Sequence, residues 1–252
     1  MKISQNISVS RCANQKSFSL LELTVVIGIL AILICLTIPN LRALTERSQR
    51  AAAAANLRII ALAHINFIRD HGHVIRPSDF YELGGQASGD GDANLVATLL
   101  AKYGYISDIS VWMWDFDPLT KKNMVETMYD AVADRIAEKF RGKQSGGNTP
   151  LSVVCCIAKD SFKNDDELLS SKIPCCYSRG LSSQGQWNSF SDANSGIWGN
   201  RGGLIAFFDG HVEWFPTISG RFQQHGTALP TNNLDQTLPE SAYFVSWQGK
   251  EL

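Results

Sequence analysis

The sequence lacks an excess of either charge. Its 252 residues include 23 Lys and Arg against 24 Asp and Glu, which gives a formal net charge of −1. There is no overall basic field to attract nucleic acid, and no acidic excess of the kind found in disordered chains. We therefore expect no nucleic-acid partner. A hydrophobic content of 44% suffices for one full-sized domain with a core, and two large domains would not fit in this length.

The sequence also lacks the short motifs of common catalytic sites. It contains no nucleophile elbow, zinc motif, phosphate-binding loop or paired-carboxylate signature. We therefore predict that the protein is not an enzyme and has no cofactor. His64, His71 and His73 lie close together in the sequence, but no carboxylate-rich ligand set with fixed spacing follows them. A structural role near a helix end is favoured over a metal site.

A partial calcium-loop pattern occurs at residues 89–95, GDGDANL, with Asp90, Asp92 and Asn94. Leu95 stands where the loop requires Gly, and Ala101 stands where it requires Glu. We predict instead that Asp92 or Asn94 caps a short helix with the sequence LVATLLAKYG. Calcium binding is kept as a minor alternative.

One long apolar run dominates the N-terminal part of the chain. Residues 18–38, FSLLELTVVIGILAILICLTI, contain a single charged residue, Glu22. As a helix this run would span roughly 31 Å, about the thickness of a bilayer core, so it is predicted to be a transmembrane helix. A cleaved secretory signal would be shorter and would end in small residues, whereas Pro39 and Asn40 lead into more helix-forming sequence. A carboxylate within hydrocarbon costs at least about 2.5 kcal/mol, so Glu22 is expected to have a partner or a function.

The helix is predicted to continue over residues 39–72 as an amphipathic segment. Apolar residues recur there at three- and four-residue spacing, and residues 51–55 are all Ala, which favours helix strongly. Gly72 is a plausible stop. The recurring residues are Leu41, Leu44, Ala51, Ala54, Leu57, Ile60, Ala61 and Ile65.

The start of the apolar run, SFSLLELTVVIGILAIL, resembles the prepilin cleavage and methylation motif of type IV pilins and type II secretion pseudopilins, whose usual form is G-F-T-L-[IV]-E. In that family a peptidase on the cytoplasmic side cuts before the Phe and methylates the new amino terminus. The resemblance implies a leader over residues 1–17 and a cut between Ser17 and Phe18, with Ser17 standing where the family has Gly. It also implies that Glu22 pairs with the amino terminus of a neighbouring subunit during assembly, and that Pro39 is the family's proline at the end of the membrane-spanning stretch.

Residues 73–252 are predicted to form an extracytoplasmic α+β domain. Within it, residues 121–140 place apolar side chains on one stripe at helical spacing, which predicts a core-facing helix. The stripe comprises Met124, Met128, Val132, Ile136 and Phe140, with Val125 and Tyr129 beside it.

Two predicted strands, LSVVCCIA and IPCCY, each carry a pair of adjacent cysteines. The four residues are Cys155, Cys156, Cys175 and Cys176. Adjacent cysteines seldom bond each other, so disulfides between the two segments are the leading hypothesis. A zinc site is the alternative, but neighbouring residues of a strand point to opposite faces and do not easily bind one ion.

The segment GGLIAFFDGHVEWF at residues 202–215 predicts a β-hairpin. Asp209 and Gly210 separate two apolar or alternating runs, and Asp-Gly favours a turn in which both central residues have positive φ. The segment also resembles the C-terminal hairpin G-G-x-x-x-F-x-D-G-H-V-E of a large bacterial group of pilin-like proteins. Gly199 stands where some of those proteins have His. We interpret His211 and Glu213, like Asp209, as structural.

Together these patterns predict a pilin-like fold, with a long transmembrane and amphipathic helix packed on a small α+β domain that contains an antiparallel sheet. The resemblance implies a filament subunit of a type II secretion system, held by one helix in the inner membrane, with its C-terminal domain periplasmic or extracellular. Its implied partners are the prepilin peptidase and other pilin or pseudopilin subunits. A minor or competence pilin shares the same motif and stays open.

A binding module with a pilin-like anchor is the second hypothesis. All six tryptophans lie beyond residue 110, and such rings can form a surface on which polysaccharide stacks, although they more often fill a core. They are Trp112, Trp114, Trp187, Trp198, Trp214 and Trp247.

Overall fold

The computed structural model describes residues 19–83, 92–137, 140, 149–163, 168–190, 195–246 and 248–250, without the side chains of residues 36–40, 249 and 250. The elements divide into two compact units, with the boundary after Ser48. The described elements are α1 (Leu20–His71), η1 (Pro77–Leu83), α2 (Ala93–Lys102), η2 (Ile109–Val111), α3 (Pro118–Lys121), β1 (Tyr129–Asp130), β2 (Arg135–Ile136), β3 (Val153–Ala158), β4 (Pro174–Ser178), η4 (Gly199–Arg201), β5 (Gly203–Phe207), β6 (Val212–Phe215), β7 (Phe222–Gln223), β8 (Pro230–Thr231), η5 (Leu234–Thr237), β9 (Ala242–Ser246) and β10 (Gly249–Lys250).

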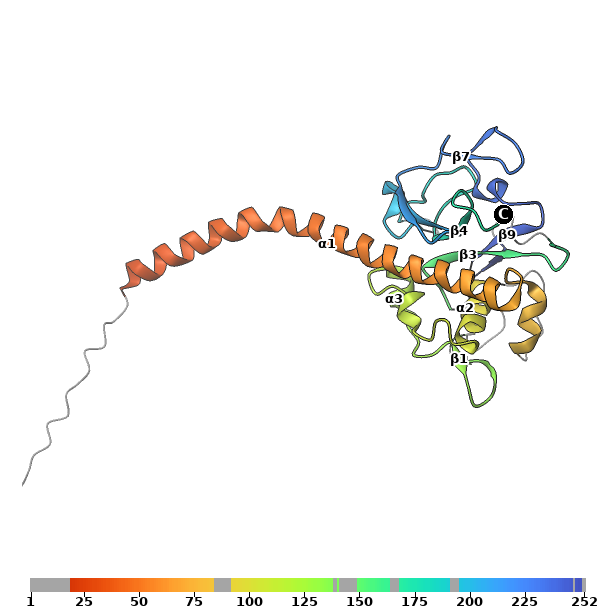
Figure 1. Cartoon of the computed structure of the whole chain (residues 1–252). Helices are drawn as coiled ribbons and strands as arrows, with labels where there is room; N and C mark the ends of the chain where they lie inside the picture. Colours follow the sequence, from red (N-terminus) through yellow and green to blue (C-terminus); the bar gives the residue numbers. More distant parts are fainter. Residues whose placement is uncertain are drawn as a thin grey trace, which may run out of the picture. The chain divides into compact units, whose positions relative to one another are not determined.

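The predicted long helix is present as α1, which runs for 52 residues (Figure 1). Its backbone stays helical through Pro39. It ends at His71 because Gly72 adopts a φ of 75° while its N–H bonds to the Ile68 carbonyl at 2.8 Å, so the predicted stop is confirmed. The second unit begins at Gln49, and it therefore includes the later part of the helix together with the predicted domain over residues 73–252.

The second unit is built around a six-stranded sheet with the order β10-β9-β3-β4-β5-β6. Every neighbouring pair is antiparallel, and two short hairpins, β1-β2 and β7-β8, lie outside this sheet. With the helices this makes an α+β domain. The predicted strands around the cysteine pairs are confirmed as β3 and β4, and the predicted hairpin is confirmed as β5 and β6.

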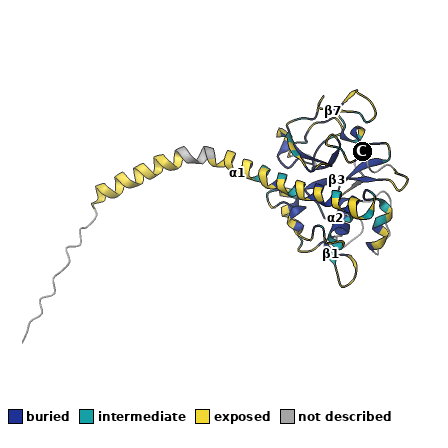
Figure 2. Cartoon of the chain, in the orientation of Figure 1, coloured by how far each residue is buried: buried dark blue, intermediate teal, exposed yellow. Residues whose placement is uncertain are grey.

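The later part of α1 covers one face of this sheet. Leu57 and Ile60 are completely buried, and the carbonyl of Leu57 lies 3.8 Å from the thiol sulfur of Cys176 on β4. On β6, the indole ring of Trp214 lies beneath the Arg50 guanidinium, whose carbon is 3.6 Å from the ring centroid. Figure 2 shows the buried residues concentrated in the sheet and α2.

The opposite face of the sheet is covered by the chain between β6 and β9. Side chains alternate along a strand, so Phe207 and Phe215 point away from α1. The ring of Phe222 on β7 packs against both, with centroids 6.2 Å from Phe207 and 5.3 Å from Phe215. The core is therefore a sheet between a helix and a mostly irregular layer.

The prediction of a helix over residues 121–140 is wrong. α3 ends at Lys121, and β1 and β2 form a hairpin farther along. The Asp130 carboxylate accepts the N–H groups of Val132 and Ala133, which stabilises a turn in place of a helix. Val132 is 99% exposed at this turn, so the apolar spacing that suggested one buried stripe does not correspond to one face.

The predicted short helix is present as α2, and the choice between two caps is settled. Asp92 is the N-cap and accepts the N–H of Leu95 at 2.9 Å. Asn94 lies inside the helix, where its side-chain amide donates to the Thr149 carbonyl at 2.9 Å. Asp90 of the partial calcium pattern lies outside the described residues.

Candidate functional site

The candidate site suggested most strongly by the sequence is the start of α1. Ser17 and Phe18, where cleavage is predicted, lie outside the described residues, and α1 begins at Leu20 with Ser19 before it. The N–H of Ser19 donates to the Glu22 carboxylate at 3.2 Å, and the Ser19 hydroxyl accepts the N–H of Leu21 at 3.3 Å. These bonds form a variant of the capping box, so Glu22 has a local structural partner that the sequence analysis missed.

The first part of α1 presents apolar side chains on all sides. The residues from Leu20 to Cys35 are all exposed in the isolated chain (Figure 2). A helix that is apolar all round is typical of a segment surrounded by lipid or by other helices. Large side chains with about half or more of their surface exposed are Leu20, Leu21, Leu23, Val25, Val26, Ile27, Ile29, Leu30, Ile32, Leu33 and Ile34.

Length and composition also mark residues 41–71 as a helix that could cross a membrane. However, 44% of its most apolar window is buried inside the protein, including Leu57 and Ile60. Those side chains already have an apolar environment, whereas the side chains of residues 20–35 have none. The exposed segment is therefore the better candidate for membrane contact.

The four clustered cysteines lie on the two central strands β3 and β4 and are completely buried. They are free thiols in the structure, and Cys155 lies directly opposite Cys176 in the register of the two strands. Burial raises the pKa of the Cys155 and Cys156 thiols, which disfavours the reactive thiolate. The predicted disulfides remain a prediction, and the strand register names Cys155 and Cys176 as the pair to test. No group of three or more side chains that could hold a metal ion is assembled among the described residues, and the zinc alternative stays untested.

The three histidines near the end of α1 do not converge on one ligand position. The Nδ1 atom of each lies within hydrogen-bond distance of a backbone carbonyl, at 3.0 Å for His64, 3.1 Å for His71 and 3.0 Å for His73. His71 also stacks on Phe67 with ring centroids 4.1 Å apart. His64 is fully buried, which lowers its pKa to about 4 despite its hydrogen bond to the Ile60 carbonyl. These contacts support structural roles.

The hairpin between β5 and β6 has a longer loop than predicted. Only Gly210 has a positive φ, at 84°, so the expectation of two positive φ values at Asp209 and Gly210 is wrong. Four residues separate the strands, and the N–H of Gly210 bonds to the Phe207 carbonyl at 2.9 Å. Such a turn requires positive φ only at the glycine.

One carboxylate–imidazole contact lies in this loop. The Asp209 carboxylate lies 2.5 Å from Nδ1 of His211. Burial raises the pKa of Asp209, but the hydrogen bonds from the backbone and ring of His211 outweigh it and lower the pKa overall. The imidazole also stacks on Phe207 with ring centroids 4.1 Å apart. The ring is therefore held in a defined position at the end of the sheet.

The tryptophans mostly fill the core, so the interpretation of them as core residues is confirmed for those described. Trp214 is partly buried beneath Arg50, and Trp247 lies outside the described residues. The remaining tryptophans, Trp112, Trp114, Trp187 and Trp198, are at most 4% exposed. A ligand surface made of these rings is not available.

Two features escaped the sequence analysis because they join distant segments. The first is a buried ion pair between Asp117, just before α3, and Arg179, just after β4. The second is an open groove of about 850 Å³ between the β7–β8 hairpin and one end of the main sheet. Neither β7 nor β8 was predicted, because each has only two residues and no alternating apolar pattern marks so short a strand.

No known protein family, curated protein or solved structure matches this chain. The function must therefore be argued from the residues and from their arrangement. Among the described residues, the exposed apolar segment of α1, with Glu22 at its start, and the open groove are the features that most need an external partner.

Proposed function

We propose that the chain is a structural subunit of a type IV pilus-like filament, specifically a pseudopilin of a type II secretion system. In this proposal the prepilin peptidase removes residues 1–17 and methylates Phe18. Before assembly the subunit is anchored in the inner membrane with its C-terminal domain on the outer side. It then assembles with other pilin or pseudopilin subunits. The main support is the continuous helix α1, whose first part is apolar and exposed while its later part is built into an α+β domain.

Physical chemistry explains why such a helix favours assembly. Large apolar side chains from Leu20 to Ile34 would be unfavourable in water, because each fully buried Leu or Ile side chain gains about 1.5–3 kcal/mol on leaving it. Lipid satisfies this requirement before assembly, and neighbouring helices satisfy it in a filament. Because the second unit has a core of its own, the exposed segment is free for this contact.

The alternative of a pilin-anchored binding module loses most of its original support, because four of the six tryptophans that would form the ligand surface are buried. A minor or competence pilin would share the same helix and the same processing. Genes for a secretion ATPase and an outer-membrane secretin beside this one would favour the pseudopilin, and a gene for a retraction motor would favour the pilin.

The first test is the amino terminus of the mature protein, measured by mass spectrometry. The proposal expects a methylated Phe18, and an intact leader in assembled material would contradict it. A second test separates the local role of Glu22 from its proposed role in assembly. Glu22→Gln keeps a side-chain oxygen that can accept the Ser19 N–H but removes the charge.

We expect Glu22→Gln to insert into the membrane but to fail in assembly, because the charge that would pair with a neighbouring amino terminus is absent. Ser19→Ala is the matched control, since it removes the other half of the cap and keeps the charge. It should assemble nearly normally. If Glu22→Gln assembles like the wild type while Ser19→Ala does not, Glu22 acts only as a helix cap.

A further inference from the structure

The open groove in the second unit lies on the side of the sheet that faces away from α1. One wall is formed by the end of the sheet and the chain that enters β4, and the other is formed by the β7–β8 hairpin. Its volume of about 850 Å³ is within the range of ligand-binding clefts. Polar side chains around it include Lys172, His211, Glu213, Arg221, Gln223 and Thr227.

The groove has a rigid inner wall. Phe207, Phe215 and Phe222 come from three different strands, and their ring centroids lie 5.3 to 6.4 Å apart. All three are buried, so they fix the hairpin to the sheet. The hairpin is also held from its other side, because the N–H of His225 donates to the Gln236 carbonyl at 2.7 Å. The groove is therefore preformed, which lowers the entropy cost of binding a ligand.

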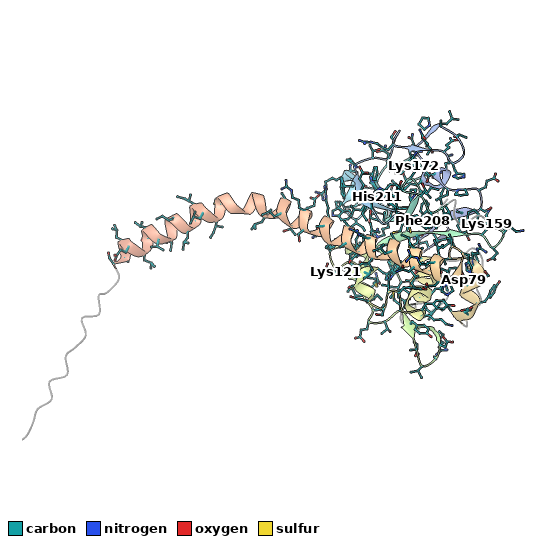
Figure 3. All side chains as sticks on the ribbon, in the orientation of Figure 1. Asp79, Lys121, Lys159, Lys172, Phe208 and His211 are labelled. Carbon is teal, nitrogen blue, oxygen red and sulfur yellow. The ribbon has the colours of Figure 1, made fainter. Side chains whose placement is uncertain are left out.

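Three charged side chains line the groove without an ion pair among the described residues. Lys172 and Arg221 are cationic, and Glu213 is anionic. Their backbone groups form hydrogen bonds, such as the one from the Arg221 N–H to the Ile218 carbonyl, but their charged ends form none among the described residues. His211 also lines the groove, and its ring stacks on Phe207 of the aromatic wall. Figure 3 labels Lys172 and His211 in the same part of the domain, away from Lys121 near α3.

We propose that this groove binds an acidic oligosaccharide. The guanidinium of Arg221 and the ammonium of Lys172 would bind the carboxylates of uronate residues, and Arg can do so with two parallel hydrogen bonds. The Glu213 carboxylate would accept hydroxyl groups of the sugar. A nucleic acid or an acidic peptide is less suitable, because its negative charges would repel the Glu213 carboxylate. An acidic sugar carries several hydroxyl donors beside each carboxylate, and these can bind Glu213.

The test is a binding titration of the full-length chain in detergent micelles with a short oligogalacturonate. The same oligomer with methyl-esterified carboxylates is the ligand control, since it keeps the sugar rings and loses the charge. Arg221→Gln is expected to raise the Kd about 10-fold, the loss typical of one charge-assisted contact. Lys172→Gln is expected to raise it about 3-fold, because the ammonium makes a single, better hydrated contact.

Lys121→Gln is the matched control, since it removes an exposed cation outside the groove. It should leave the Kd unchanged. If Lys121→Gln lost as much affinity as Arg221→Gln, the binding would be a general effect of positive charge. Absence of saturable binding at millimolar ligand, or equal binding of the methyl ester, would overturn the proposal. Tighter binding of single-stranded DNA or polyglutamate at equal charge would show that the saccharide assignment is wrong. Unchanged thermal unfolding of each variant verifies that the groove is intact.

Discussion

The buried ion pair between Asp117 and Arg179 offers the sharpest test of how the second unit is held together. The two side chains are 0% and 1% exposed. Nε of Arg179 donates to Oδ2 of Asp117 at 3.1 Å, and its Nη2 donates to Oδ1. The Ser152 hydroxyl donates to the same carboxylate at 2.8 Å, and the Ser195 carbonyl accepts from Nη1 of Arg179. Each charge is therefore stabilised mainly by the other, in a place that water does not reach.

We expect Arg179→Met to destabilise the domain strongly, because it leaves the Asp117 carboxylate buried without a counter-charge. Removing one partner of a buried pair costs about 3–5 kcal/mol. In a domain of this size each kcal/mol lowers Tm by about 2–4 °C, so Tm should fall by between about 6 and 20 °C. Asp117→Asn should cause a similar loss, since it leaves the guanidinium without its partner.

The double variant gives the decisive comparison. The double variant buries no unpaired charge, because both charges are absent. Its loss of stability should therefore be smaller than the sum of the losses of the two single variants, by about 3 kcal/mol or more. Thermal and urea unfolding of the full chain in detergent, followed by tryptophan fluorescence, would measure this. Lys102→Met is the control, because it breaks an ion pair with Asp134, whose side chain is 62% exposed, together with one hydrogen bond to the Glu82 carbonyl, and should change Tm far less. Additive losses, or an Arg179→Met change as small as the control, would refute the reasoning.

Three other predictions follow from buried groups. The pKa of His64 falls from 6.5 to about 4 on folding, so the unfolded chain binds more protons than the folded chain between these pH values. The free energy of unfolding should therefore fall by about 3 kcal/mol as the pH is lowered from 6.5 to 4. In urea titrations, His64→Leu should reduce this dependence of stability on pH. Gly203→Ala should cost about 1–3 kcal/mol, since its Cβ would lie 2.3 Å from the buried Trp187 ring; an unchanged urea midpoint would contradict this. With a reductant present to keep all thiols free, iodoacetamide should label Cys155 and Cys156 only after unfolding, because both are buried and burial raises the pKa of both thiols. Rapid labelling of the folded chain, seen by mass spectrometry, would exclude such burial.

Features set by neighbouring residues could be predicted from the sequence. The end of α1 at Gly72 and the cap of α2 at Asp92 follow from local backbone chemistry, and both are present. The strands around the cysteine pairs and the β5–β6 hairpin were likewise found from short apolar runs and turn residues. The α+β class follows from these elements together.

Local patterns failed where two local signals competed. Residues 121–140 have the apolar spacing of a helix, but Asp130 also offers a side-chain acceptor that stabilises a turn. Asp134 continues this turn with a φ of 48°, a conformation outside any α-helix. Val132 is therefore fully exposed at the turn. Its exposure results from the hydrogen bonds of the Asp130 side chain, which the spacing of apolar residues does not reveal.

The long-range features could not be predicted from one sequence. Asp117 and Arg179 are separated by 62 positions, and neither has a local pattern that names the other. The groove combines Lys172, before β4, with Arg221, beside β7, and only the folded sheet brings them to one cavity. Contacts between such distant residues depend on the order of the strands in the sheet, and this order cannot be read from residue spacing.

The two parts of α1 show what sequence can and cannot distinguish about a helix. Both are apolar enough to suggest a membrane or a core. Residues 18–38 contain a single charged residue, and residues 41–71 are also long and apolar enough to cross a membrane. Burial distinguishes the two parts, because Leu57 is enclosed by the domain whereas Leu30 is exposed. A helix segment without an internal partner must find one outside the subunit, either lipid or another helix. In the proposed filament, the Glu22 carboxylate, which already accepts the Ser19 N–H, still has oxygen lone pairs for a cation supplied by a neighbouring subunit.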